Sequence, residues 1–317
     1  MNYIVLDLEW NQSPTGKEDE MEGLPFEIIE IGAVKLNEKF EVIGEYSRTI
    51  RPQVYRRLHY KTRELLHMNM KELAHSKPFT AVVADFFAWC GTDYRICTWG
   101  ITDLLELQRN MAFYHFANPL PRPLTYYDVQ KLFSIDVEDG RVRRALSVAA
   151  KMLEIPETRP FHRALDDAAY TAEVLRRLNM KKVGSYLSVD YFRPPANKEE
   201  ELYLKFPEYS KYVSRVFRTK EEALSDKTVI AAGCSHCRSL VWRKIRWFAS
   251  GPKMYLCLVF CPRHGYVKGK LRIKRVPAGV FVVKTMKRTD EDGAKLIRDR
   301  KAEIAAKRKG KHSKVEM

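Results

Sequence analysis

The chain has 317 residues, 45% of them hydrophobic, which is enough for two domains with buried cores. Its formal net charge of +16 favours a polyanionic partner. Six cysteines in a chain of this length do not suggest a disulfide scaffold, and no apolar run reaches the roughly 20 residues of a membrane span. No secretory signal is recognisable, so we expect a cytoplasmic protein without a membrane partner.

The N-terminal stretch 3–10 predicts a strand that is buried on both faces, because six of its eight residues are apolar. It also contains Asp7 and Glu9, whose spacing of two places both side chains on the same face. Two carboxylates in apolar surroundings need a cationic partner, and a divalent metal binds such oxygen ligands well. The alternative is that the strand ends at Leu6 and that water solvates both acids.

The chain after this strand predicts an α/β arrangement. The polar insert at 11–23 is typical of a loop, and two strands joined by a tight turn then complete an antiparallel meander. Helical and strand-like stretches alternate after the meander, which indicates a sheet with helices on both faces. The later strands are expected at 27–36, 40–50, 95–99 and 124–129, and the helices within 62–90, 102–111, 145–153 and 165–178.

Two further acids and a histidine stand at predicted helix starts. Asp103 follows a predicted strand, and Asp167 lies in the first turn of a later helix, shortly after His162. Each acid is also compatible with a simple capping role, because carboxylates stabilise helix N-termini. The functional alternative is that Asp167 projects toward Asp7 and Glu9, while His162 approaches a bound water.

Taken in chain order, three short motifs resemble those of the DEDD 3′→5′ exonucleases of the histidine subtype (DEDDh). The resemblance covers about residues 1–180, and the stretch 28–34 resembles the second strand of that family. It implies the family's α/β fold, a ribonuclease H-like mixed sheet with three antiparallel strands and flanking helices. The motifs are Asp7-Leu8-Glu9, Trp99-Gly100-x-x-Asp103 and His162-Arg163-Ala164-Leu165-Asp166-Asp167.

The resemblance implies phosphodiester hydrolysis with two Mg²⁺ or Mn²⁺ ions. In the family scheme Asp7 bridges both metals and Asp103 supports the second one. Glu9 and Asp167 bind the metal that activates the water. His162 is the expected general base, a role that suits the near-neutral reference pKa of imidazole.

One departure from the family pattern concerns the pocket for the 3′-terminal nucleotide. Many relatives carry Thr-Thr-Gly after the acidic pair, whereas this chain has Trp10, Asn11 and Gln12. We expect Trp10 and Asn11 to bind the nucleic acid there, with Trp10 supplying a stacking face for the terminal base. Trp10 is equally compatible with a place in the core at the end of the strand.

Two short hooks late in the chain have the spacing of a structural zinc site. Cys234 and Cys237 form a Cys-x-x-Cys pair, and Cys261 and His264 form a Cys-x-x-His pair about two dozen residues later. We expect these four residues to bind one Zn²⁺ in a small β-rich module that resembles a zinc ribbon. Cys257 is the alternative fourth ligand, although its apolar neighbours favour a place in the core.

Positive charge is concentrated around these hooks, since no acidic residue occurs between Asp226 and Asp290. Basic residues interleaved with aromatic ones suit a nucleic acid strand, whose phosphates pair with cations and whose bases stack on rings. Trp242 and Phe248 are instead expected to form the core of the module. The residues expected to contact nucleic acid here are Arg243, Lys244, Arg246, Lys268 and Lys270.

These patterns divide the chain into an exonuclease domain at 1–180, a charged, partly helical connector at 181–226, the zinc module at 227–282 and a basic tail at 283–317. The leading hypothesis is a 3′→5′ exonuclease of single-stranded RNA or DNA. RNA is preferred, because the motifs are closer to the branch that trims RNA 3′ ends. The alternative is a catalytically silent nucleic-acid-binding or adaptor protein, and the module is also a candidate surface for a protein partner.

Overall fold

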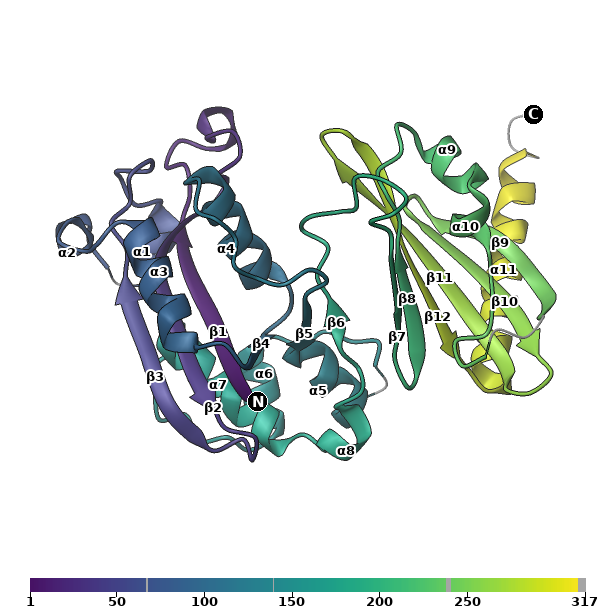
Figure 1. The fold of residues 1–317 in the computed structure, drawn as a ribbon, viewed down its shortest axis with the longest axis horizontal. Helices are drawn as coiled ribbons and strands as arrows, with labels where there is room; N and C mark the ends of the chain where they lie inside the picture. The colour runs from purple at the N-terminus through teal and green to yellow at the C-terminus, as the bar shows by residue number, and fades with distance from the viewer. Residues whose placement is uncertain (67, 139, 238–240, 313–317) are drawn as a thin grey trace. The chain divides into compact units, whose positions relative to one another are not determined.

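The computed structural model describes residues 1–312 except 67, 139 and 238–240, and for 308–312 it describes the backbone alone. The chain divides into two compact units, Met1–Phe192 and Arg193–Met317 (Figure 1). Residues 313–317 of the predicted basic tail lie outside the described part. Within that part, no helix has both the length and the apolar character that crossing a lipid bilayer requires.

The first unit is built on a six-stranded mixed sheet with the strand order β3-β2-β1-β4-β5-β6. β1, β2 and β3 pair antiparallel, β4 and β5 continue the sheet in parallel with β1, and β6 returns antiparallel to β5. The predicted α/β fold with three antiparallel strands is confirmed. The strands are β1 (Asn2–Asn11), β2 (Glu27–Leu36), β3 (Val42–Thr49), β4 (Tyr94–Thr98), β5 (Thr125–Asp128) and β6 (Ser188–Val189).

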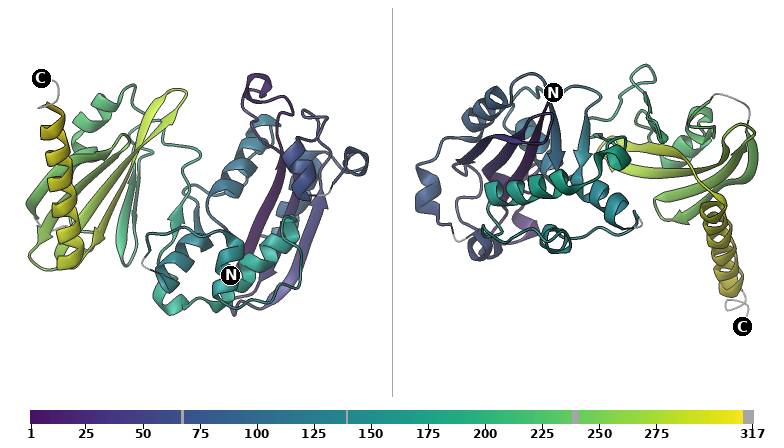
Figure 2. Two further views of the ribbon diagram at one scale, coloured as in Figure 1. Left: turned by 180° about the vertical axis from the view of Figure 1, so that it is seen from behind. Right: turned by 90° about the horizontal axis from the view of Figure 1, so that it is seen from below.

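Helices cover both faces of this sheet, because alternate residues of β1 point to opposite sides. Leu6 and Leu8 share a core cluster with α3 and α4, whereas Val5 shares one with α5, α6 and α7 (Figures 1 and 2). Asp7 and Glu9 follow Val5 at intervals of two and lie on the α7 side. The helices are α1 (Tyr60–Leu66), α2 (Met70–Ala74), α3 (Phe79–Cys90), α4 (Thr102–Phe113), α5 (Val129–Val137), α6 (Leu146–Met152), α7 (Ala164–Arg177) and α8 (Met180–Val183), with a 3₁₀ helix at Lys17–Asp19.

The second unit is a six-stranded antiparallel sheet with the order β7-β8-β12-β11-β10-β9. Ala223 and Val229 of two short helices pack on one face beside Leu271. Ala294 of the C-terminal helix packs beside Leu258 of β10 on the other face. The elements are β7 (Leu202–Lys205), β8 (Tyr209–Val213), α9 (Lys220–Ser225), α10 (Lys227–Ile230), β9 (Trp242–Gly251), β10 (Met254–Cys261), β11 (Gly265–Val276), β12 (Gly279–Arg288) and α11 (Glu291–His312).

The predicted β-rich character of this region is confirmed, and the sheet is larger than the small module that the sequence indicates. The stretch 181–226, for which the sequence predicts a connector, contributes β6 to the first sheet and β7 and β8 to the second. β7 lies at the edge of its sheet, where alternate residues stay exposed. The charged composition of this stretch therefore gives no clear strand pattern, and the sequence does not predict these short strands.

Candidate active site and cysteine cluster

Asp7 and Glu9 lie on the central strand β1, and β2 supplies their direct neighbours. In the antiparallel register Asp7 pairs with Gly32, and Glu9 pairs with Glu30. The register shifts between Glu9 and Trp10, so both acids lie in the regular part of the strand, directly before the irregularity. Both side chains are half-buried on the face that α7 covers.

The start of α7 brings Asp167 to this pair of acids. Gly32 permits the approach, because a Cβ at that position would lie 2.1 Å from the carbonyl carbon of Ala164. Asp167 stands in the first turn of α7. Asp7, Glu9 and Asp167 each offer a carboxylate oxygen, and these oxygens lie within 4.8 Å of one another. Three of the four predicted metal ligands therefore form one acid cluster.

Asp103 reaches the same end of the sheet from the first turn of α4. This helix follows β4, the strand that runs parallel to β1. Oδ1 of Asp103 accepts a hydrogen bond of 3.3 Å from the backbone N–H of Leu8, the residue between Asp7 and Glu9. The fourth predicted ligand is therefore held beside the acid cluster by the strand itself.

Burial raises the pKa values of all four carboxylates, and repulsion from neighbouring acids adds to this effect. Burial raises the pKa of Asp7 well above its ordinary range, and the charges of Asp103 and Glu9 add to this effect. Burial likewise raises the pKa of Glu9 to about 8, that of Asp103 to about 7 and that of Asp167 to about 6. Among the described atoms, the buried Oδ1 of Asp167 has no hydrogen-bond partner. This crowded set of oxygen donors fits divalent metal ions.

His162 stands just before α7, with an exposed side chain and a φ of 72°, which few residues other than glycine adopt. The adjacent Arg163 ties this turn to the sheet. Its Nη2 donates to Oε1 of Glu30 at 2.8 Å, and its Nε donates to Oε2 at 3.1 Å. Because Glu30 is almost fully buried and is the strand neighbour of Glu9, this pair fixes the histidine turn next to the acid cluster.

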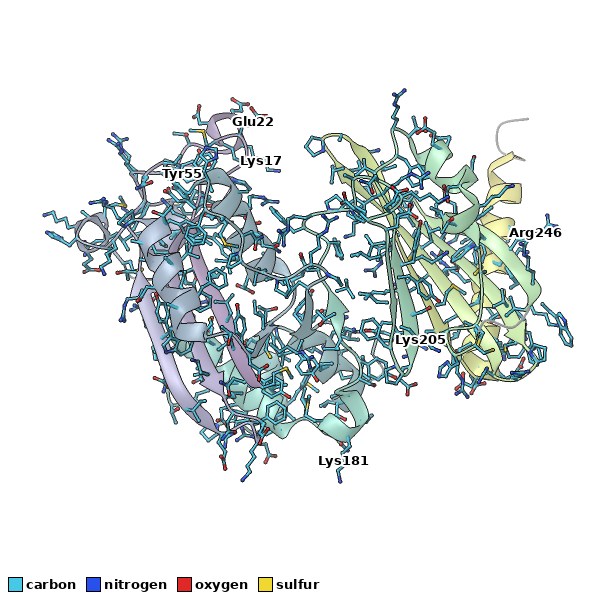
Figure 3. The ribbon with its side chains drawn as sticks, viewed as in Figure 1. Lys17, Glu22, Tyr55, Lys181, Lys205 and Arg246 are labelled. Atoms are coloured by element: carbon cyan, nitrogen blue, oxygen red, sulfur yellow. The ribbon has the colours of Figure 1, made fainter. Side chains whose placement is uncertain are left out.

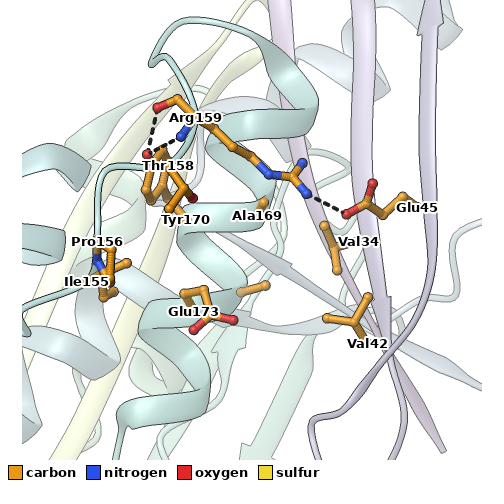
Figure 4. Close-up of a pocket in the computed structure, with 11 residues that line it drawn as sticks. Val34, Val42, Glu45, Ile155, Pro156, Thr158, Arg159, Ala169, Tyr170 and Glu173 are labelled. Carbon is orange, nitrogen blue, oxygen red and sulfur yellow. Dashed lines mark hydrogen bonds and ion pairs between the residues drawn. The ribbon is translucent and has the colours of Figure 1, made fainter.

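The segment before His162 is held at a second point. The Tyr170 hydroxyl accepts a hydrogen bond from the backbone N–H of Arg159 at 3.0 Å and donates one to its carbonyl at 2.6 Å. The Arg159 guanidinium lies 3.0 Å from the carboxylate of Glu45 (Figure 4). These groups border a pocket of about 260 Å³ whose lining contains none of the four acids, so this pocket is separate from the candidate active site.

Asn11 has a structural role, which corrects the predicted nucleic-acid contact. Its side chain is fully buried, and its Nδ2 donates to the carbonyls of Tyr55 at 3.1 Å and Arg57 at 2.9 Å. Its Oδ1 accepts from the N–H of His59 at 2.9 Å. The Asn11 amide thus holds the loop after β3 and has no polar group left to present to a nucleotide.

Trp10 is half-buried, and its ring lies against Phe26 with a centroid distance of 5.5 Å. It packs on the same core cluster as α3 and α4, which accounts for one side of the ring. A contact between the rest of the ring and a terminal base remains a prediction.

A comparison with known protein families agrees with this geometry. The RNase_T family model, described as exonuclease, matches residues 4–175, which is more than half of the chain and includes all four acids. The chain belongs to this exonuclease family. Its first unit is accordingly a nuclease domain, a hydrolase of nucleic acids.

The nuclease domain is similar to solved structures at low sequence identity. The cell-death related nuclease CRN-4 is 16% identical with a TM-score of 0.50, over 63% of this chain and 73% of that one. The nuclease domain of 3′hExo, a DEDDh family member bound to rAMP, is 19% identical with a TM-score of 0.49, over 60% of this chain and 96% of that one.

Among curated proteins, the PolC-type DNA polymerase III of Thermotoga petrophila is 27% identical over 197 residues. The match covers 57% of this chain and 12% of the polymerase, so the chain spans a small part of that relative's length.

The two predicted zinc hooks meet in the second unit. Their four donor atoms lie within 4.8 Å of one another and come from Cys234, Cys237, Cys261 and His264. The Sγ atoms of Cys237 and Cys261 are 3.6 Å apart, and Nδ1 of His264 lies 3.5 Å from Sγ of Cys234. Donors around a tetrahedral zinc lie roughly 3.3–3.8 Å apart, so these residues fit the ion. Cys257, the alternative ligand, is buried in the core and is not among the four.

Lys284 supports the first hook, although the sequence offers no signal that separates it from the many other lysines of this region. Its buried Nζ donates to the carbonyls of Thr228 at 2.6 Å, Val229 at 3.0 Å and Ala231 at 2.8 Å. Burial lowers the pKa of Lys284 to about 8. The segment that leads into Cys234 is thereby tied to β12.

The basic residues predicted to contact nucleic acid lie on two strands. Arg243, Lys244 and Arg246 are exposed on the edge strand β9, and Arg246 extends away from the sheet (Figure 3). Lys268 and Lys270 are half-buried on β11 and, being two residues apart, share one face. Their contact with nucleic acid remains a prediction.

The two aromatic residues expected in the core of this unit differ in their burial. Phe248 packs with the α11 residues Ala294 and Ile297, as expected of a core residue. Trp242 is 58% exposed, so the expectation of a buried side chain is wrong for it. The reason is its place at the start of an edge strand, which the sequence pattern does not show.

Proposed function

We propose that this protein is a metal-dependent 3′→5′ exonuclease that releases nucleotides from single-stranded nucleic acid and prefers RNA to DNA. The observation that carries the proposal is the convergence of Asp7, Glu9 and Asp167 on one cluster beside Asp103, in a domain of the exonuclease family. Folding alone does not favour four neighbouring carboxylates, because their repulsion destabilises the native state.

The four acids would hold two Mg²⁺ or Mn²⁺ ions. The all-oxygen donor set, the raised pKa values and the unpartnered Oδ1 of Asp167 support this assignment. When bound, such ions supply an activated water and neutralise the charge that develops on the scissile phosphate. The chain contributes the positions of the ligands, which Gly32 and the Leu8 N–H fix.

His162 would act as the general base. One imidazole nitrogen takes the proton of the attacking water, and the exposed ring can then return that proton to solvent. The left-handed backbone supports this role, since such conformations cluster at functional sites. Arg163 is a positioning residue in this scheme, because its pair with Glu30 fixes the turn that carries His162.

The direction of cleavage and the preference for RNA rest on the motifs. The segments around Asp103 and His162 resemble the members that trim RNA 3′ ends, and the half-buried Trp10 ring is a candidate stacking face for the terminal base. Contacts to the 2′-hydroxyl would distinguish RNA from DNA.

The second unit would hold one structural Zn²⁺ and bind the substrate strand. The geometry of the cysteine cluster and the lack of acidic residues between Asp226 and Asp290 support these roles. A protein partner at the same surface is the competing role. Nucleic acid binding should weaken steeply with salt, whereas an apolar protein interface should not. The predicted contacts are Arg243, Lys244, Arg246, Lys268 and Lys270.

The test is digestion of RNA and DNA strands of identical sequence, each labelled at the 5′ end. A ladder that shortens from the 3′ end with Mg²⁺, and that disappears with EDTA or in Asp7→Ala, is the expected result. RNA should be degraded faster. Tight, salt-sensitive binding without cleavage of either strand would instead favour the catalytically silent binding protein.

A further inference from the structure

Three aromatic side chains form a row across the second sheet. Trp242 of β9 and Tyr266 of β11 are the direct strand partners of Phe260 of β10, so all three rings lie on one face. The Trp242 and Phe260 rings are stacked, with centroids 5.6 Å apart and an interplanar angle of 18°. Phe260 and Tyr266 meet edge to face at 5.1 Å. We call these three residues the aromatic platform.

The platform is not an ordinary part of the core. Trp242 is 58% exposed, and Phe260 and Tyr266 are half-buried. Trp247 on the same strand shows what a structural tryptophan does here, since its Nε1 donates to the Ile230 carbonyl at 2.8 Å and its ring joins two core clusters. Trp242 is the member whose ring is most open to a ligand.

Cations flank the platform on both sides. Nζ of Lys244 lies 5.7 Å from the ring centroids of Trp242 and Phe260. The Arg298 guanidinium lies 5.4 Å from the Tyr266 centroid and donates to the Tyr266 hydroxyl at 3.1 Å. No strand of this part of the sheet carries an acid, because none occurs between Asp226 and Asp290. The three contiguous rings therefore have one cationic side chain near each end of the row.

We infer that the aromatic platform binds unpaired bases of a single-stranded nucleic acid. A base stacks on the exposed ring of Trp242, and a neighbouring phosphate pairs with Lys244, which lies beside that ring. Every base has a π-face, so binding of this kind tolerates any sequence. The inference deepens the proposed function, on which it rests for the identity of the polymer, and it assigns Trp242 a role in holding the substrate strand.

Charge complementarity selects this occupant over an apolar protein segment. The rim of a protein interface is polar, whereas the charge beside the exposed Trp242 ring is that of Lys244. At the other end of the platform, Arg298 is paired with Glu291 at 2.7 Å. Stacking requires an exposed ring and phosphate pairing requires a cation, and Trp242 and Lys244 supply the two side by side. If a protein segment bound here instead, a nucleic acid strand should not quench the fluorescence of Trp242, and the experiment below measures this quenching.

The experiment is a titration of the full chain in EDTA with a uridine oligonucleotide and with an abasic oligomer of equal length and charge. The variants are Trp242→Ala, Trp242→Phe and the control Tyr203→Ala, which removes a ring that is 60% exposed on β7. Trp242→Ala should bind the uridine oligomer at least about tenfold more weakly than the control. Trp242→Ala and Tyr203→Ala should bind the abasic oligomer with equal affinity. Trp242→Phe should keep part of the wild-type affinity for the uridine oligomer.

Tryptophan fluorescence supplies a direct readout of stacking. The chain has five tryptophans, and the uridine oligomer should quench wild-type emission more than that of Trp242→Phe. Equal affinities of Trp242→Ala and Tyr203→Ala, or quenching as strong in Trp242→Phe as in the wild type, would overturn the inference. Hydrolysis is followed separately with wild-type protein and Mg²⁺, so failure of the proposed function is distinguishable from failure of the platform.

Discussion

Gly32 of β2 lies against the backbone of Ala164 at the start of α7, and the same glycine is the strand partner of Asp7. One close contact therefore sets the distance between the strand and the helix that carry the acid cluster. Because the obstructing atoms belong to the backbone, they cannot yield as a flexible side chain would.

Gly32→Ala should push α7 away from the sheet. We expect the free energy of unfolding to fall by roughly 1–3 kcal/mol, because the added methyl overpacks the contact. We also expect kcat to fall at least about tenfold, because Asp167 moves away from Asp7 and small displacements of catalytic groups cost large factors. Gly44→Ala is the control, since its Cβ would meet Trp89 at an ordinary 3.6 Å. Equal activity of the two variants would contradict the role of this contact.

Glu30→Gln should impair kcat more than KM. The neutral amide cannot form the charge-assisted pair with Arg163, so the turn that carries His162 loosens while the substrate surface stays intact. The free energy of unfolding should fall by roughly 1–3 kcal/mol, as is usual for a lost hydrogen bond to a charged group. Glu138→Gln is the matched control, because it removes an ion pair of 2.8 Å to Arg144. Similar kcat values in both variants would assign Glu30 a purely structural role.

The metal-free protein should become less stable as the pH rises. The pKa values of Glu9, Asp103 and Asp167 are raised in the folded state to about 8, 7 and 6, so this state binds more protons than the unfolded chain above pH 4. Their contribution to stability is present at low pH and is lost as the pH rises to about 8. In EDTA, the Tm should therefore fall between pH 5 and pH 8.5 by at least a few degrees.

Asp7→Asn tests the cause of this pH dependence. Removing one of the mutually repelling charges should flatten the decline of Tm and raise the Tm at pH 8.5 in EDTA, even though activity is lost. The exposed Glu64 of α1 supplies the control, Glu64→Gln, which should keep the wild-type slope. A slope that is unchanged in Asp7→Asn would place the responsible groups elsewhere.

The cysteine cluster should bind one zinc ion per chain. Cys234→Ser should lose the metal and lower the thermal stability of the second unit, because a structural zinc contributes folding free energy. Cys257→Ala should keep the full zinc content, since Cys257 lies outside the four-residue cluster. Elemental analysis of the purified variants checks this. Zinc retained in His264→Ala but lost in Cys257→Ala would reverse the assignment of the fourth ligand.

The sequence was sufficient to predict the fold of the first unit and the positions of its acids, because each of these features depends on a short stretch of the chain. Alternation within 3–10 predicts that Asp7 and Glu9 share a face, and helix-start patterns predict the positions of Asp103 and Asp167. The family resemblance then joins these local signals into one site. Asn11 was misjudged because a buried amide that binds three backbone groups of a distant loop has no local signature.

The remaining features depend on contacts between distant parts of the chain. The pair of Glu30 and Arg163 joins residues far apart in sequence, and it exists only because β2 lies beside β1 and α7 begins there. The exposure of Trp242 depends on β9 being an edge strand, which follows from the strand order of the second sheet. Strand order is not encoded in hydrophobic periodicity.

The most direct test of the account compares Asp167→Asn with Asp166→Asn in single-turnover cleavage of 5′-labelled RNA with Mg²⁺. The two acids are adjacent, but Asp167 belongs to the acid cluster, whereas Asp166 faces the Arg159 guanidinium at 3.5 Å. We predict that Asp167→Asn cleaves at least about a hundredfold more slowly than wild type, because it loses a metal ligand, and that Asp166→Asn stays close to the wild-type rate. Equal rates in the two variants would contradict the assignment of the acid cluster as the hydrolytic centre.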